Sequence, residues 1–315
     1  MADALTVDQL RQELAKRQLL RAAVLVAGDY SGLDLHNVRF EQVDARQARF
    51  TGANLTGCVF IDCQLQGAIF DHCTASGLNL HDSTLDGVSF RQTQFSAGQW
   101  LRCTAKGLSL SGAQWQNVSL AECSLSALAV DDARLERCQF SQCQVSAMDA
   151  SGVTWSQVRM TDCQLQNMQF SSSHLYQCAF DRSQLTDVDF SSAKTLSLSL
   201  YQCSGERLRC NRADLSKALL VHTNFPQAEF TETLLAFANL SSARMDGASF
   251  AHARLTYTQA RYLQARQASF NGADLSGADF HAAELQDCDW SDAKRDAMRP
   301  VDHERLAAEC WQPTL

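Results

Sequence analysis

The sequence has very little proline and no excess of basic residues. It contains three prolines in 315 residues, and Pro226 is the only one between Tyr30 and Trp290. That stretch can therefore pair almost all of its backbone N–H groups. Lys and Arg number 27 against 35 Asp and Glu, a net charge of −8. Because nonspecific binding to phosphate backbones needs positive charge, we expect no direct contact with nucleic acid.

Long hydrophobic runs are also missing. The most apolar stretch, residues 19–27, is interrupted by Arg21 and is too short to cross a bilayer. The first fifteen residues include Asp3, Asp8 and Glu13, whereas a secretory signal begins with basic residues. We therefore expect a cytoplasmic protein without a membrane partner.

Sequence motifs typical of catalysis, cofactor binding or metal binding are absent as well. The glycines recur at a fixed phase and do not form a phosphate-binding loop between a strand and a helix. Catalysis or metal binding needs titratable groups that converge, but the eight histidines are scattered along the chain. We therefore predict no enzyme, no cofactor and no metal site. The histidines are His36, His72, His81, His174, His222, His252, His281 and His303.

What the sequence does have is a strict five-residue period. Almost every fifth residue from Tyr30 to Trp290 is apolar, which makes fifty-three units in one unbroken phase. Neither a helix, with 3.6 residues per turn, nor an alternating strand has this period. A short repeat over most of a chain predicts an all-β solenoid whose turns bury their inner faces on one another.

The cysteines follow the same period. Eleven of the thirteen lie two residues before an apolar centre, in a slot that elsewhere holds Ala or Val. We interpret them as small buried hydrophobic residues, because their spacings are multiples of five and not those of a zinc site. Reduced thiols favour a cytosolic compartment. The eleven are Cys58, Cys63, Cys73, Cys103, Cys123, Cys138, Cys143, Cys163, Cys178, Cys203 and Cys288.

The repeated unit is a small apolar residue, a polar residue, Leu or Phe, and two polar residues. Residues 53–57 (ANLTG) and 273–277 (ADLSG) show it best. In this the chain resembles the pentapeptide repeat family over about residues 28–292. The resemblance implies a right-handed quadrilateral β-helix with four units, or twenty residues, in each coil. The centre and the residue two before it would point inward.

A second period supports four sides. We name the faces after their first centres: face A from Tyr30, face B from Leu35, face C from Phe40 and face D from Ala45. Of the twenty aromatic centres, sixteen fall on faces A and C, so large rings would oppose each other across the interior. Fifty-three units then give about 13 coils.

Both open ends of such a solenoid need covering. Thr6 and Gln9 form the pattern of a helix capping box, which predicts a helix over about residues 7–25 within an N-terminal cap, 1–27. The β-helix itself is expected over 28–292. In the C-terminal cap, 293–315, Pro300 suits the first turn of a helix. Leu306, Cys310 and Trp311 could pack on the last coil, and a homodimer through an end cap is the alternative.

The charges are uneven between faces. Up to Asp289, face A carries nine acidic residues against four arginines, a net of −5, while face B has a net charge of +1. Some members of the family resemble duplex DNA in shape and charge and bind DNA gyrase, which they inhibit or protect from quinolones. Duplex DNA carries a charge every ~1.7 Å of its axis, far more than this chain does. A DNA mimic that modulates gyrase is therefore our alternative function.

The outward slots are mostly polar, but in the C-terminal half several are not. Contiguous exposed apolar and aromatic residues are typical of a protein interface, although single ones are common on any surface. We predict that these residues on faces B and C bind another protein: Tyr176, Leu196, Tyr201, Leu219, Val221, Leu234, Phe237, Tyr257 and Tyr262.

The predicted function is thus a non-catalytic protein-binding scaffold. Its N-terminal helix, the following SGLDL segment at residues 31–35 and the cysteine-rich repeat resemble pentapeptide proteins that accompany type VI secretion effectors. This resemblance implies an adaptor role, with a secretion effector, spike or adaptor component as the partner.

Overall fold

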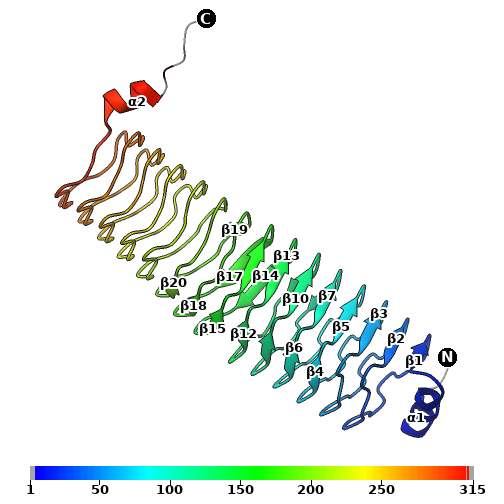
Figure 1. Cartoon of the computed structure of the whole chain (residues 1–315). Helices are drawn as coiled ribbons and strands as arrows, with labels where there is room; N and C mark the ends of the chain where they lie inside the picture. The colour runs from blue at the N-terminus through cyan, green and yellow to red at the C-terminus, as the bar shows by residue number, and fades with distance from the viewer. Residues whose placement is uncertain (1–3, 310, 312–315) are drawn as a thin grey trace, which may run out of the picture. The chain divides into compact units, whose positions relative to one another are not determined.

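The structure is a computed structural model that describes residues 4–309 and 311. It divides into two compact units, one up to Gln164 and one from Leu165 onward. Each unit consists of stacked β coils, and two short helices lie near the ends of the chain, as Figure 1 shows.

The first unit opens with a helix, α1 (Val7–Lys16), and continues in short strands. The strands are β1 (Leu19–Arg21), β2 (Arg39–Glu41), β3 (Val59–Ile61), β4 (Thr74–Ser76), β5 (Asn79–His81), β6 (Gln94–Ser96), β7 (Gln99–Leu101), β8 (Thr104–Lys106), β9 (Gln114–Gln116), β10 (Ser119–Ala121), β11 (Ser124–Ser126), β12 (Arg134–Glu136), β13 (Gln139–Ser141), β14 (Gln144–Asp149), β15 (Thr154–Ser156) and β16 (Arg159–Thr161).

β17 (Gln164–Gln169) begins at the boundary between the units. The second unit contains β18 (His174–Tyr176), β19 (Gln184–Thr186), β20 (Lys194–Leu196) and the helix α2 (His303–Glu309). Between β20 and α2 the coils pair through single parallel bridges instead of longer strands.

All pairing is parallel with a register of twenty residues. In the first unit, Phe40 lies opposite Phe60, and Leu135 lies opposite Trp155. In the second unit, the bridge from Glu229 to Ser249 follows the same rule. Because the sequence repeats every five residues, each twenty-residue step returns a residue to the same slot of the next coil. Each unit is therefore an all-β solenoid, as the period predicted.

The strands of the first unit form three parallel ladders. One has the order β1-β2-β3-β5-β7-β10-β13-β16 and corresponds to face C. A second, β15-β12-β9-β6-β4, corresponds to face B, and a third, β14-β11-β8, corresponds to face D. In the second unit, β18 pairs with β20 in register on face B.

The two inward slots form the core. From Leu33 to Phe280 both are buried in every repeat unit, with only Gly205 partly exposed. Rings stack from coil to coil, for example Phe50 on Phe70 with centroids 4.9 Å apart and Phe230 on Phe250 with centroids 5.1 Å apart. The prediction that aromatic rings line the interior is confirmed.

Eleven of the twelve described cysteines are buried in this core with free thiols, and Cys288 is half-buried. Cys58 donates to the Leu35 carbonyl oxygen at 2.8 Å, and burial raises the pKa of its thiol to about 12. Cys63 has the same environment, with a pKa raised to about 11 by burial. Such thiols stay protonated and unreactive at neutral pH, which fits their interpretation as small hydrophobic residues.

The last slot of every unit has a left-handed backbone. Each fifth residue from Ala22 to Ala297 has a φ between +49° and +71°, and most of these residues are not glycine. Glycine takes this conformation without penalty, whereas a side chain costs about 1–2 kcal/mol. The sequence predicted the corner from its glycines. It did not predict that the corner persists where the side chain is large.

The N-terminal helix is shorter than predicted. α1 begins at a complete capping box between Thr6 and Gln9, as expected, but it ends at Lys16 instead of near residue 25. β1 then pairs with β2, Leu19 opposite Arg39, so the coils begin before residue 28. The physical reason is that Leu20 and Leu25 keep the five-residue phase and are buried as centres.

The C-terminal end also differs from the prediction. The coil register continues to Arg299, and α2 begins at His303, after Pro300, which lies outside the helix. No residue of α2 is buried, Leu306 is half-buried, and Trp311 is 71% exposed. Trp311 therefore does not pack on the last coil, and Cys310 lies outside the described residues. Among the described helices none is long and apolar enough to cross a membrane.

Candidate protein-binding surface

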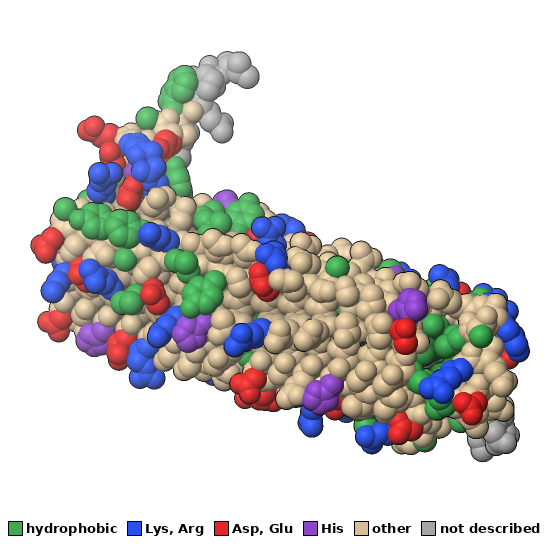
Figure 2. All heavy atoms as spheres, turned by 60° about the horizontal axis from the view of Figure 1, so that its bottom comes forward, with side chains coloured by type: hydrophobic (Ala, Val, Ile, Leu, Met, Phe, Trp, Pro, Cys, Tyr) green, Lys and Arg blue, Asp and Glu red, His purple; other side chains and the backbone are tan. Residues whose placement is uncertain are grey.

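All nine residues predicted to bind a partner lie in the second unit. Seven are exposed, and Tyr201 and Val221 are half-buried. They occupy outward slots because both inward slots of their repeat units are filled by a buried centre and a small residue. Figure 2 shows several groups of hydrophobic side chains on the surface of this unit, with basic side chains close by.

One group follows the corner between faces B and C. Tyr176 and Leu196 are register partners in β18 and β20. Phe237 and Tyr257 are stacked, with ring centroids 5.3 Å apart and planes 10° from parallel. Ser216 and Lys217 lie between the two pairs, so the structure does not bring the group into one unbroken stripe. Leu219 and Leu234 are exposed in the neighbouring slots.

Phe237 and Tyr257 are unusual in two respects. Their side chains are 57% and 61% exposed, and both have a left-handed backbone, with φ of 60° and 57°. A bulky residue in this conformation is a genuine outlier. The same slot of the next coil holds Gly277, where a Cβ atom would lie 2.6 Å from the Tyr257 ring. The Tyr257 ring thus lies over a position that has no side chain.

The second group follows the corner between faces C and D. Tyr201 contacts His222, with ring centroids 6.2 Å apart, and Val221 is the outward residue one coil after Tyr201. Tyr262 contacts His281 in the same manner, at 6.1 Å. The two tyrosines therefore present a ring edge beside an imidazole.

Tyr262 also contacts α2. Its hydroxyl donates to the Glu309 carboxylate, which lies 3.1 Å from His281 Nε2 and accepts from Arg305 Nε at 2.7 Å. These donors lower the pKa of Glu309 to about 2, the Tyr262 hydroxyl contributing most. The His281 ring is only 3% exposed, so it forms the buried side of this contact. The Glu309 carboxylate thus holds α2 against the coils of the second unit.

This contact predicts a pH dependence for α2. The folded pKa of Glu309 is below its ordinary value of 4.5, so the contact stabilises α2 docking above about pH 4.5 and is lost as the pH falls toward 2. We expect the Glu309 carboxyl signal not to titrate between pH 7 and pH 5 and to titrate only as the pH falls toward 2. Glu309→Gln should shift the Tyr262 ring signals at pH 7, while Glu304→Gln should not. Equal shifts in both variants would contradict the assignment.

The first unit also has polar clusters on its surface, away from the exposed apolar residues. Within residues 4–309 and 311 no group of three His, Cys, Asp or Glu side chains is placed to hold a metal ion. A surface groove of the first unit is lined by Asp71, His72, Arg91, Asp131 and Asp132. Asp71 Oδ1 there accepts from both Ser89 Oγ and the Arg91 N–H of the next coil, so this carboxylate is already engaged in a coil-to-coil contact.

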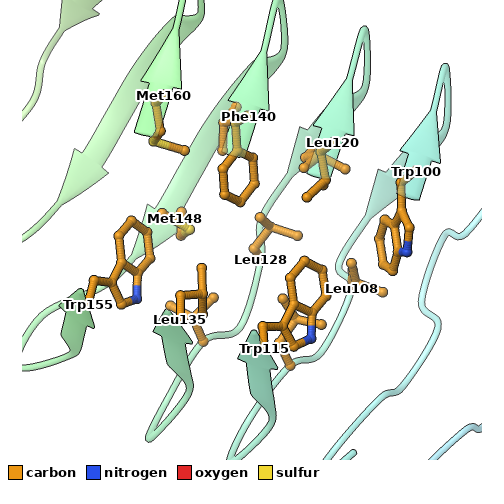
Figure 3. Close-up of a pocket in the computed structure, with 14 residues that line it drawn as sticks. Trp100, Leu108, Trp115, Leu120, Leu128, Leu135, Phe140, Met148, Trp155 and Met160 are labelled. Atoms are coloured by element: carbon orange, nitrogen blue, oxygen red, sulfur yellow. The ribbon is translucent and has the colours of Figure 1, made fainter. Parts of the chain in front are cut away.

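The interior of the first unit is no binding pocket either. Figure 3 shows the core residues around its internal cavity, among them Trp100, Trp115, Leu128 and Phe140. The cavity offers only about 10 Å³, the least space in which a single water fits, and its lining is apolar. A cavity of this size and lining holds no ligand larger than a water molecule.

Sequence reasoning missed the charged neighbours of the surface. Lys217 occupies the slot of Phe237 one coil earlier, and Arg254 is the bridge partner of Leu234. The twenty-residue register contains this signal, since 217, 237 and 257 share a slot. The contact of Tyr262 with Glu309 has no sequence signal, because it joins the repeat to a helix of different period.

Comparisons with known proteins agree with the fold. The family model described as "Pentapeptide repeat region" matches residues 53–130 and 133–209. The model described as "Pentapeptide repeats (8 copies)" matches residues 34–71, 209–240, 233–272 and 261–294. No curated protein matches the chain.

Several solved structures are similar, all at low identity. Full-length QnrB1, a plasmid-mediated fluoroquinolone resistance protein, is 16% identical with a TM-score of 0.35, covering 56% of this chain and 93% of QnrB1. HetL from Nostoc sp. strain PCC 7120, a pentapeptide repeat protein involved in heterocyst differentiation regulation, is 17% identical with a TM-score of 0.23, covering 93% and 98%. The A-module of the mannuronan C-5 epimerase AlgE6 from Azotobacter vinelandii is 9% identical with a TM-score of 0.29, covering 90% and 89%.

The family models together extend over residues 34–130 and 133–294, which is most of the chain. The same stretch has the five-residue core period, the twenty-residue register and the left-handed corner described above. The chain therefore belongs to the pentapeptide repeat family.

Proposed function

We propose that this protein is a non-catalytic scaffold that binds another protein through the exposed apolar residues of its second unit. The observation that carries the proposal is the Phe237–Tyr257 stack. Two large rings stand mostly in solvent, in a backbone slot that disfavours them. Tyr and Phe are both enriched in protein interfaces, and Tyr is among the residue types that contribute most to binding there.

The cost of this arrangement supports a functional reading. The left-handed slot costs a non-glycine residue about 1–2 kcal/mol, and burial returns little of that to a ring that is mostly exposed. Neither ring fills the core, because the inward centres Leu235 and Leu255 do so. The left-handed slot is common to all coils, so the size and exposure of these two rings, and not the backbone alone, set them apart.

The test is the double variant Phe237→Ser with Tyr257→Ser. We expect it to fold, since both side chains face solvent, and to lose about 30-fold or more in affinity for the partner, the effect of removing a hot spot. Gln227→Ser with Gln267→Ser is the matched control, because these residues occupy the same left-handed slot at another corner. Affinity is measured by calorimetry with the co-purified partner. Equal affinity of both double variants would refute the proposal.

The finer assignment is an accessory role in type VI secretion, supported by the sequence resemblance alone. On this proposal the partner is a secretion effector, a spike protein or an adaptor. Affinity purification of the tagged chain from its native cell should recover such a component. Recovery of a type II topoisomerase alone would overturn the assignment.

A DNA mimic that binds gyrase is the alternative, and the charges favour it less. Several carboxylates of the second unit are paired with arginines, for example Asp189 with Arg209 at 3.2 Å and Asp246 with Arg266 at 2.8 Å. Ion-paired carboxylates do not present the uniform negative field of a phosphate backbone. Inhibition of supercoiling or protection from quinolones at low protein concentration would favour mimicry.

We also propose the finer architecture: a right-handed, four-sided β-helix of about 13 coils, with the two helices as caps. The N-terminal cap is supported by Leu10 of α1, which is fully buried, and by Tyr30, whose hydroxyl donates to the Leu5 carbonyl at 2.6 Å. The free thiols support a reducing, cytoplasmic compartment. A dimer through an end cap is testable by sedimentation.

A further inference from the structure

We propose that the Phe237–Tyr257 patch recognises a protein segment that carries an apolar anchor next to carboxylates. The patch consists of Leu219, Leu234, Phe237 and Tyr257, and its basic rim consists of Lys194, Lys217 and Arg254. This inference rests on the proposed function and adds the chemistry of the partner.

The basic rim is arranged around the rings by the coil register. The Lys217 N–H donates to Ala236 O and the Phe237 N–H donates to Thr256 O, so Lys217, Phe237 and Tyr257 occupy one slot of three consecutive coils. Consecutive coils are ~4.8 Å apart. Arg254 is the bridge partner of Leu234 on face B. A cation therefore lies about one coil from the aromatic pair and another beside the aliphatic residue.

The cations of the rim form no close ion pair among the described residues, although Arg254 is the register partner of Asp274 and helps to lower the pKa of its carboxyl. Among the described residues, Lys194, Lys217 and Arg254 make no ion pair, whereas Arg207, Arg261 and Arg266 of the same unit are each paired with an aspartate. Two carboxylates share this register: Asp214 lies between Lys194 and Leu234, and Asp274 follows Arg254. Both also accept from a serine N–H, of Ser216 and Ser276, at 3.1 Å. The three cations outnumber these two carboxylates by one, so the rim keeps a net positive charge, and charge complementarity with a partner can select that partner.

Within the second unit, a carboxylate of the helix α2 is already bound by an exposed tyrosine of the coils. Glu309 of α2 accepts from the Tyr262 hydroxyl and lies beside His281 and Arg305. On the coil surface the carboxylate is thus held by a tyrosine hydroxyl and an imidazole, while Arg305 belongs to α2 itself. Tyr257 has a hydroxyl in the same type of slot, with a φ of 57° like that of Tyr262.

Single-stranded nucleic acid is the other ligand that uses aromatic rings and basic residues. Three observations favour a protein. The two rings stack on each other at 5.3 Å, which leaves no room for a base between them. Leu219 and Leu234 extend the patch with aliphatic surface. The net charge of −8 opposes a ligand with a charge on every nucleotide.

The experiment is a selection from a displayed library of random 16-residue peptides on the full chain. We expect enriched peptides with Phe, Trp or Leu within four residues of at least two carboxylates. Their affinity should fall tenfold or more in Phe237→Ser/Tyr257→Ser and also in Lys217→Glu/Arg254→Glu. The charge-matched control, Lys106→Glu/Arg244→Glu, should bind normally. Circular dichroism confirms that each variant is folded.

The outcomes separate the two proposals. Peptides without carboxylates, lost in the serine variant but retained in the Lys217→Glu/Arg254→Glu variant, would overturn the partner chemistry and leave the binding surface in place. Peptides that bind the serine variant normally, or no enrichment at all, would overturn both. Binding of a dT15 oligonucleotide that is lost in the serine variant would show a nucleic-acid site instead and overturn the inference.

Discussion

Phe250→Ala is expected to destabilise the second unit by about 3–5 kcal/mol, the cost of removing a fully buried ring. Phe250 has no exposed surface, and its ring stacks on Phe230 and on Phe270, each with centroids 5.1 Å away. A coil contacts only its two neighbours, so the cavity cannot be filled from elsewhere in the core.

Urea denaturation followed by circular dichroism measures this loss. Phe250→Leu is the matched control, since it keeps most of the volume and should cost less than half as much. The effect should remain local, with amide exchange faster in the coils that contain Phe230 and Phe270 and unchanged near Tyr30. Loss of stability spread evenly over all coils would contradict the nearest-neighbour picture.

Gly205→Ala is expected to have the second large effect, about 3 kcal/mol or more, because the added atom meets backbone and not a flexible side chain. Gly205 replaces a centre residue, and a Cβ atom at this position would lie 1.9 Å from the Leu185 carbonyl oxygen. The coil has closed toward the empty centre, so a side chain can no longer enter.

Gly107→Ala separates this steric effect from the backbone effect. Gly107 has a left-handed φ of 70° with nothing within 4 Å of the added atom, so its substitution should cost only about 1 kcal/mol. Both variants are compared by thermal melting and by amide exchange at residues 185 and 205. If the two glycines cost the same, the close approach to Leu185 is relieved by movement of the coil.

The core of this protein could be predicted residue by residue, because period and burial coincide. Residues in phase with Tyr30 were expected to be inside, and the structure buries all of them up to Phe280 except Gly205, which is partly exposed. Leu285 and Trp290, at the end of the repeat, are half-buried. Leu20 and Leu25 were misassigned to a helix because, together with Leu10 and Leu14, they also fit an approximately helical spacing. Their agreement with the five-residue phase was the better signal, although both residues precede the region in which the repeat motif is recognisable.

The candidate surface was only partly predictable. Exposure of Phe237 and Tyr257 followed from their slot, but their direct stacking and the ring of Tyr257 above Gly277 depend on side-chain directions. The position of α2 could not be predicted at all. Its contacts are polar, made by Glu309 with Tyr262 and His281, and such contacts leave no periodic trace in a sequence.

Because of the twenty-residue register, the distance along the solenoid between two outward side chains of the same slot can take only certain values. Two outward side chains in the same slot are separated by whole steps of ~4.8 Å, whatever residues lie between them. Excision of residues 197–216 would therefore join Leu196 to Lys217 without disturbing the phase of any later residue, and it would bring Tyr176 and Leu196 one step closer to Phe237 and Tyr257. Duplication or loss of one coil thus changes the distance between two groups of binding residues, while the residues in each group stay the same. Partner specificity can therefore evolve through a change in the number of coils alone.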